Sequence, residues 1–269
     1  PSARAAPPTE PTVATPAASP AGNAGEIASK ADLLLWPDRP STRDLVFRIS
    51  NAGLATSVTG SDARTRIGGN KRMLVVLLTP PGVKGMAWLV QPGPAETAQW
   101  VYDPNFQHVR KIVPVQGFES FLTSGYTYAD LGLVDLGSTY TLLGDEQRDG
   151  KRAYKVQATP REPWYYSKIV TWVDADTFAP LAREYYDRTG ALWKTEGFGP
   201  VQDIGGVPTI LERRIDDKQS GVSTTMTASS VRYDAALPGD LFDPAQLPKA
   251  ASASVWQGAP PSPEPRATP

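Results

Sequence analysis

The chain has 269 residues and a nearly balanced charge, with 27 Lys and Arg against 28 Asp and Glu. Because it has no basic run to neutralise a phosphate backbone, we expect no nucleic acid among its partners. The absence of cysteine excludes disulfides, thiolate metal sites and cysteine nucleophiles. The longest apolar runs, such as MLVVLL at 73–78, are far shorter than the ~20 residues that a membrane-spanning helix needs.

The two ends of the chain differ in composition from the rest. Residues 1–25 contain six prolines and eight alanines, and residues 250–269 contain five more prolines. Segments with so few large apolar side chains cannot bury enough surface to offset their ordering entropy. We therefore predict flexible tails at 1–25 and 250–269 around one folded domain at 26–249. Since the chain does not begin with Met, we also expect that a signal sequence or lipid anchor once preceded it.

The domain begins with an amphipathic helix over 27–35, ended by Pro37, and continues as strands. The predicted strands lie at 45–50, 72–79, 85–91, 98–103, 108–113, 139–144, 152–158, 167–174, 180–187, 191–198, 208–215 and 223–233. The pairs Asp149-Gly150, Thr189-Gly190 and Gly205-Gly206 supply the positive φ of tight hairpins, so neighbouring strands should pair antiparallel. About eleven such strands favour a mainly β fold, either a strongly curved sheet or an open barrel.

The segment FESFLTSGYTYADL, residues 118–131, fits no strand pattern. Its apolar residues fall near helical spacing, but Gly125 and the β-branched Thr123 and Thr127 weaken a helix. We predict a marginal helix that covers part of the sheet.

Catalytic motifs are absent from the sequence: it has no glycine-rich phosphate loop, no G-x-S-x-G and no H-E-x-x-H. The single histidine, His108, alternates with Arg110 and is predicted to be an exposed strand residue. The carboxylates near 130–135 and 145–149 suit solvated turns better than a metal or acid–base site. We therefore predict that the protein is not an enzyme and binds no metal or cofactor.

Aromatic residues are frequent in the predicted strands. The simplest interpretation of any one ring is core packing. Taken together, they predict an apolar concave face, because only the helix at 27–35 and the segment 118–131 remain to cover it.

Six stretches resemble, in order, the outer-membrane lipoprotein-sorting family of LolA/LolB-like periplasmic carriers, in the branch associated with RND-type exporters. They are KRMLVVLLTPPGVKGMAWLV (71–90), WVYDPNFQHVRKI (100–112), SFLTSGYTYADL (120–131), LLGDEQRDGKRAYKV (142–156), SKIVTWVDADTFAPLAREYYDRTG (167–190) and LPGDLFDPAQL (237–247). The third stretch departs from the branch pattern G-S-D-F-[ST]-Y-E-D-L, because Gly125 and Ala129 replace two acidic residues.

The resemblance implies a half-open, strongly curved antiparallel β-barrel with a few short covering helices. It further implies a monomeric periplasmic protein of the Gram-negative envelope that carries or accepts acyl chains of a lipid or lipoprotein on their way to the outer membrane. The expected partner is an RND-type exporter or another inner-membrane donor. The predicted cavity and lid residues are Trp88, Trp100, Phe118, Phe121, Leu122, Tyr126, Tyr128, Trp172 and Tyr185.

Two alternatives remain open at this stage. The segment 118–131 is either a movable lid, as in the sorting carriers, or a static core plug. The protein is either a lipid carrier or a protein-binding accessory subunit of an exporter without lipid cargo.

Overall fold

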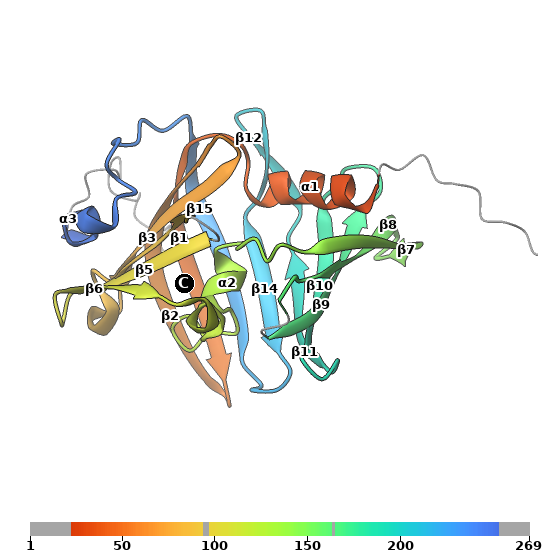
Figure 1. The fold of residues 1–269 in the computed structure, drawn as a ribbon, viewed down its shortest axis with the longest axis horizontal. Coiled ribbons are helices and arrows are strands. Elements are labelled where there is room, and N and C mark those ends of the chain that lie inside the picture. The colour runs from red at the N-terminus through yellow and green to blue at the C-terminus, as the bar shows by residue number, and fades with distance from the viewer. Residues whose placement is uncertain (1–22, 94–96, 163–164, 253–269) are drawn as a thin grey trace, which may run out of the picture.

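A computed structural model describes residues 23–93, 97–162 and 165–252. Within these residues, thirteen antiparallel strands form one strongly curved sheet that does not close (Figure 1). From edge to edge the strands are β6 (His108–Ile112), β5 (Thr97–Asp103), β4 (Ala87–Pro92), β3 (Asn70–Thr79), β2 (Leu54–Ile67), β1 (Ser41–Asn51), β15 (Ser223–Tyr233), β14 (Glu212–Asp217), β11 (Leu192–Phe198), β10 (Pro180–Asp187), β9 (Tyr166–Asp174), β8 (Lys151–Thr159) and β7 (Thr139–Arg148). A separate hairpin joins β12 (Val201–Ile204) to β13 (Val207–Ile210).

The predicted fold class is confirmed: the protein is mainly β, with one large curved antiparallel sheet and few helices. The predicted tails at 1–25 and 250–269 lie largely outside the described residues, apart from 23–25 and 250–252. The predicted first helix is α1 (Ala24–Leu35), and the side chain of Asn23 caps it by accepting a hydrogen bond from the Glu26 amide at 3.0 Å. The predicted hairpin pairs Asp149-Gly150 and Gly205-Gly206 lie at turns and have positive φ.

The sheet differs from the sequence prediction at two places. No strand was predicted at β2, because its inward-facing positions include Gly60, Asp62 and Arg64 in place of apolar residues. The predicted strand at 208–215 is divided: its first part pairs with β12 in the small hairpin, and its second part is β14 of the main sheet. The missed β2 and the division of 208–215 together explain why the predicted strand number, about eleven, is too low.

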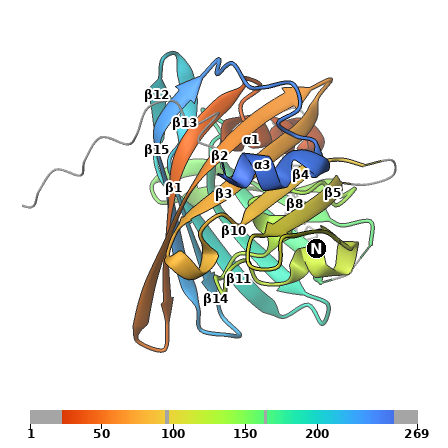
Figure 2. The same ribbon diagram turned by 90° about the vertical axis from the view of Figure 1, so that its left-hand side faces the viewer.

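The convex face of the sheet is covered at one end by the C-terminal part of the chain. There α3 (Leu247–Ser252), with Leu241 and Phe242, packs on outward residues of β3 to β5 such as Leu74 and Leu89 (Figure 2). The short 3₁₀ helices η1 (Pro81–Val83) and η3 (Pro244–Gln246) lie in connecting segments. None of the helices among the described residues is long and apolar enough to cross a membrane.

The concave face is covered by two elements. Helix α1 packs on inward residues of β8 and β9, with Ile27 and Ala31 against Tyr154 and Val173 (Figure 1). Residues 114–131, called the plug below, lie on the centre of the face and contain η2 (Pro114–Phe118) and α2 (Tyr128–Leu131). Their position between the two halves of the sheet places the main apolar core directly beneath the plug.

The predicted marginal helix at 118–131 is wrong for most of its length, since only 128–131 are α-helical and Phe118 is the last residue of the 3₁₀ helix η2. Residues 120–127 form a turn closed by an isolated bridge between Ser120 and Thr127, with Leu122 and Thr123 at φ of 53° and 61°. Gly125 is needed for packing: a Cβ there would lie 2.9 Å from Cγ2 of Ile215. The close approach to β14, which sequence spacing does not reveal, holds the turn in this shape.

Candidate functional site

The plug has an apolar end, which lies against β3 to β5. The ring of Phe121 is 5.4 Å from that of Trp88, 5.5 Å from that of Phe47 and 5.3 Å from that of Tyr128, measured between centroids. Phe121 is 3% exposed and Tyr128 is 9% exposed. Through these ring contacts Phe121 attaches the plug to β1 and β4.

A small apolar pocket lies beside this contact, between β3 to β5 and the plug residues Phe121, Leu122 and Tyr128. Its free volume is about 10 Å³, roughly enough for one water molecule. Pockets that hold drug-sized ligands measure about 300–1,000 Å³. The described conformation therefore has no room for an acyl chain unless the plug moves away.

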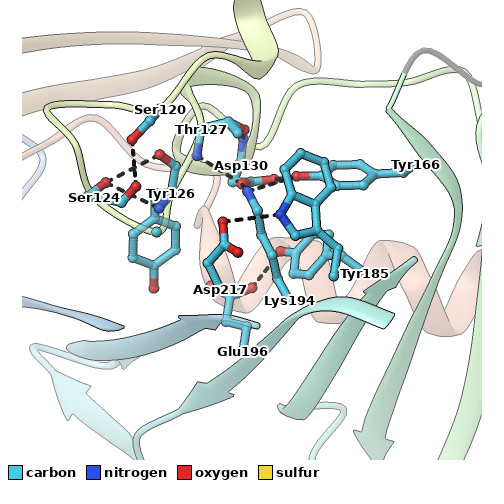
Figure 3. Close-up of polar contacts among 12 residues, drawn as sticks. Ser120, Ser124, Tyr126, Thr127, Asp130, Tyr166, Tyr185, Lys194, Glu196 and Asp217 are labelled. Atoms are coloured by element: carbon cyan, nitrogen blue, oxygen red, sulfur yellow. Dashed lines mark hydrogen bonds and ion pairs between the residues drawn. The ribbon is translucent and has the colours of Figure 1, made fainter. Parts of the chain in front are cut away.

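The other end of the plug is polar and is held by a buried ion pair (Figure 3). Lys194 Nζ of β11 lies 2.9 Å from Oδ2 of Asp130, and the Tyr166 hydroxyl donates to Oδ1 of Asp130 at 2.8 Å. The Thr127 amide also donates to Oδ2, at 2.9 Å, which closes a capping box at the start of α2. Burial alone raises the pKa of Asp130, but the charge of Lys194 and these hydrogen bonds outweigh it, so the pKa lies below its ordinary value. Asp130 is thus a carboxylate at neutral pH.

A second buried cluster lies beside the first, on β10, β11 and β14. Arg213 Nε donates to Oε1 of Glu196 at 2.8 Å, and the Tyr185 hydroxyl donates to Oε2 at 2.7 Å. Arg213 also lies over the ring of Tyr126, with Cζ 5.2 Å from the centroid. The Tyr126 hydroxyl is buried without a hydrogen-bond partner among the described residues, and burial raises its pKa well above the ordinary value. Among the described residues, the face beneath the plug therefore offers no hydrogen-bond partner to this hydroxyl of the plug.

A third cluster joins β1 and β2 on the same concave face. Asp62, which is fully buried, accepts hydrogen bonds from Arg43 Nε at 2.9 Å and from Arg64 Nε at 2.8 Å. Burial and the neighbouring charge of Arg43 lower the pKa of Arg64 to about 9, which leaves it charged at neutral pH.

Sequence reasoning missed all three charged clusters. Charged residues at alternating strand positions usually indicate a solvent-exposed face. One feature of the sequence could have indicated them: small residues such as Ala63 stand between the charged residues Asp62 and Arg64. Neither side of that strand therefore has the large apolar residues of an ordinary core face.

The structure brings seven of the nine predicted site residues together. Around the plug lie Trp88, Phe118, Phe121, Leu122, Tyr126, Tyr128 and Tyr185. Trp100 and Trp172 are not among them: both lie on the convex face, because strand pleating turns alternate residues to opposite sides. Trp100 is paired with the outward Leu89 and Trp172 with the outward Ala182.

One of the residues considered for catalysis, Asp130, lies in this site, and the prediction that it is solvated is wrong because it is buried and paired with Lys194. The others lie apart from it. His108 is the exposed first residue of β6. Asp145 forms an exposed ion pair with Arg152, and Glu146 accepts from the Trp172 indole on the convex face. Among the described residues, no group of His, Asp and Glu could hold a metal ion.

A model of a family of uncharacterized proteins, DUF1329-like, matches residues 69–249. The chain belongs to this family. It is similar to a solved DUF1329 family protein from Desulfovibrio piger, with 26% identity and a TM-score of 0.75 over 82% of this chain and 96% of that one. None of the curated protein sequences is similar enough to count as a match.

Two further solved structures share the fold. A putative outer membrane lipoprotein-sorting protein domain from Vibrio parahaemolyticus has a TM-score of 0.77 at 24% identity, over 83% of this chain and 97% of that one. The LolA superfamily protein NE2245 from Nitrosomonas europaea has a TM-score of 0.69 at 21% identity, over 82% and 98%. This family member thus shares the fold of a lipoprotein-sorting protein domain and of a LolA superfamily protein, as the sequence resemblance predicts.

Proposed function

We propose that this protein is a non-enzymatic periplasmic carrier or acceptor, which shields the acyl chains of a lipid or lipoprotein on its concave face for transfer toward the outer membrane. The observation that carries the proposal is the apolar pocket beneath the plug, whose outer wall is one short segment of the chain. In this proposal the plug is a movable lid, and the acyl chain takes the place of Phe121, Leu122 and Tyr128.

Shielding of this kind has a clear energetic purpose. Exposing an acyl chain to water costs about 0.8 kcal/mol per CH₂, so a fifteen-methylene chain represents roughly 12 kcal/mol as an upper figure. An apolar face that is closed when empty and open when loaded lowers this barrier without exposing a large apolar surface to water.

Two features of the plug support displacement. Leu122 and Thr123 have left-handed backbone conformations that cost on the order of 1 kcal/mol or more each, and the buried Tyr126 hydroxyl makes no hydrogen bond among the described residues. Both costs are relieved when the plug leaves the sheet. The Asp130–Lys194 pair acts in the opposite direction and holds the empty protein shut.

Binding of a fluorescent fatty acid tests the proposal, together with mass spectrometry of organic extracts from natively purified protein. If the plug competes with cargo, Phe121→Ala should raise the affinity for the fatty acid, because it weakens only the closed state. Phe106→Ala removes a ring that is 79% exposed and should change nothing. Leu122→Asn is a second variant for the case in which Phe121→Ala does not fold, because Asn tolerates positive φ.

Failure of all these proteins to bind any acyl chain, with no lipid in the extracts, would refute the carrier proposal.

A second candidate, a protein-binding accessory subunit of an RND-type exporter, is favoured by one observation. The edge strand β7 is exposed along most of its length and carries Tyr140, Leu142 and Leu143, so it could pair with a strand of another protein.

A further inference from the structure

The concave face has more buried positive than negative side chains. Among the described residues, its strands contribute four buried cations and two buried carboxylates: Arg43, Arg64, Lys194, Arg213, Asp62 and Glu196. The third buried carboxylate on this face, Asp130, belongs to the plug. When the plug leaves, these four cations face two carboxylates, and the partly buried Arg183, 3.6 Å from Glu196, adds a further positive charge.

Lys194 depends on the plug for its counter-ion. It is 1% exposed, and the ion pair that it forms among the described residues is with Asp130. Glu196, two positions further along β11, is already bonded to Arg213 and Tyr185. Displacing Asp130 would leave a buried ammonium group without a partner, which is unfavourable unless another anion takes its place.

Two hydrogen-bond donors, Lys194 and Tyr166, converge on the Asp130 carboxylate (Figure 3). The Tyr166 hydroxyl lies 2.8 Å from the Asp130 carboxylate and 3.2 Å from Lys194 Nζ. Arg213 Nη2 is 3.5 Å from the backbone oxygen of Asp130. Arg213 is itself paired with Glu196, with Nη2 2.7 Å from Oε1. The lysine and the phenol directed at the carboxylate form a site for an oxyanion, which Asp130 occupies in the closed protein.

We propose that the cargo is an anionic amphiphile, whose carboxylate or phosphate group replaces Asp130 against Lys194 and Tyr166. The proposal rests on the carrier function above. A single segment holds Asp130 and the apolar side chains Phe121 and Tyr128, so one ligand that replaces it must be charged at one end and apolar at the other. Asp130 thus competes with the head group, as Phe121 competes with the acyl chain.

Titrations with oleic acid and oleyl alcohol below their aggregation concentrations test this proposal, because the two differ only in the head group. We expect the wild type to bind the acid at least roughly tenfold more tightly, the factor that corresponds to one hydrogen bond to a charged group of about 1.4 kcal/mol. Asp130→Asn should increase the preference for the acid over the alcohol, because it removes the carboxylate that competes with the head group. The double variant Asp130→Asn with Lys194→Met should lose the preference but still bind the alcohol.

The matched control is Arg214→Met, which removes a cation from the same strand as Arg213 but on the exposed face. It should leave the preference unchanged. Equal affinity for acid and alcohol in both the wild type and Asp130→Asn would overturn the head-group site while leaving the carrier function intact. If neither ligand binds any variant, the carrier function itself fails. If inorganic phosphate alone binds Asp130→Asn and displaces oleic acid, the site serves a free anion and the assignment to an amphiphile is wrong.

Discussion

Replacing Lys194 with Met should destabilise the protein through the charge that it leaves behind. The side chains of Lys194 and Asp130 are 1% and 2% exposed. Removing one partner of a buried ion pair typically costs about 3–5 kcal/mol in the free energy of unfolding. We expect about 3 kcal/mol here, at the low end of that range, because Tyr166 and Thr127 still donate hydrogen bonds to the Asp130 carboxylate.

Urea unfolding followed by tryptophan fluorescence measures this loss, and a double-mutant cycle with Asp130→Asn isolates the pair. The double variant has neither charge, so it should be more stable than the sum of the single losses predicts, by at least ~1.5 kcal/mol. The exposed pair of Arg39 and Asp234, with side chains 40% and 62% exposed, is the matched control. Neutralising Arg39 should leave the urea midpoint nearly unchanged, because water screens an exposed pair. Additive losses within ~0.5 kcal/mol in the Lys194 cycle would refute the reasoning that this pair fastens the plug.

Three further predictions concern the plug and the histidine. Gly125→Ala should lower the free energy of unfolding by about 1–3 kcal/mol, because the added Cβ would clash with Ile215. Gly197→Ala, whose Cβ would have no atom within 4 Å, should leave the free energy of unfolding unchanged. Equal urea midpoints for the two variants would contradict this prediction. Because the pKa of Asp130 is lowered in the folded protein, its stabilisation is complete above the unfolded value of about 4 and is lost as the pH falls below it. The protection factors of residues 114–131 against hydrogen exchange should therefore fall below about pH 4, and an unchanged acid response in Asp130→Asn would assign it to other groups. His108→Ala should fold and bind fatty acid like the wild type, and loss of binding in a folded variant would contradict the placement of the site.

The sequence alone determined the class of fold and most of its elements. Alternating apolar residues and the turn pairs such as Asp149-Gly150 define antiparallel strands locally, because side-chain direction in a strand has a period of two. The same patterns, with the family resemblance, placed Phe121 and Tyr128 over an apolar face. These predictions succeeded because strand and turn patterns depend on residues that are close together in the sequence.

Only the tertiary structure decided which side of the sheet each residue faces and what lies beneath the plug. Trp88 and Trp100 are equally apolar and equally plausible from the sequence, yet strand register places them on opposite faces. The partners Asp130 and Lys194 are 64 positions apart, and nothing near Lys194 in sequence shows that it is buried. Curvature of the sheet closes that distance, so a charge that looks solvated in the sequence is desolvated, and therefore must be paired, in the fold.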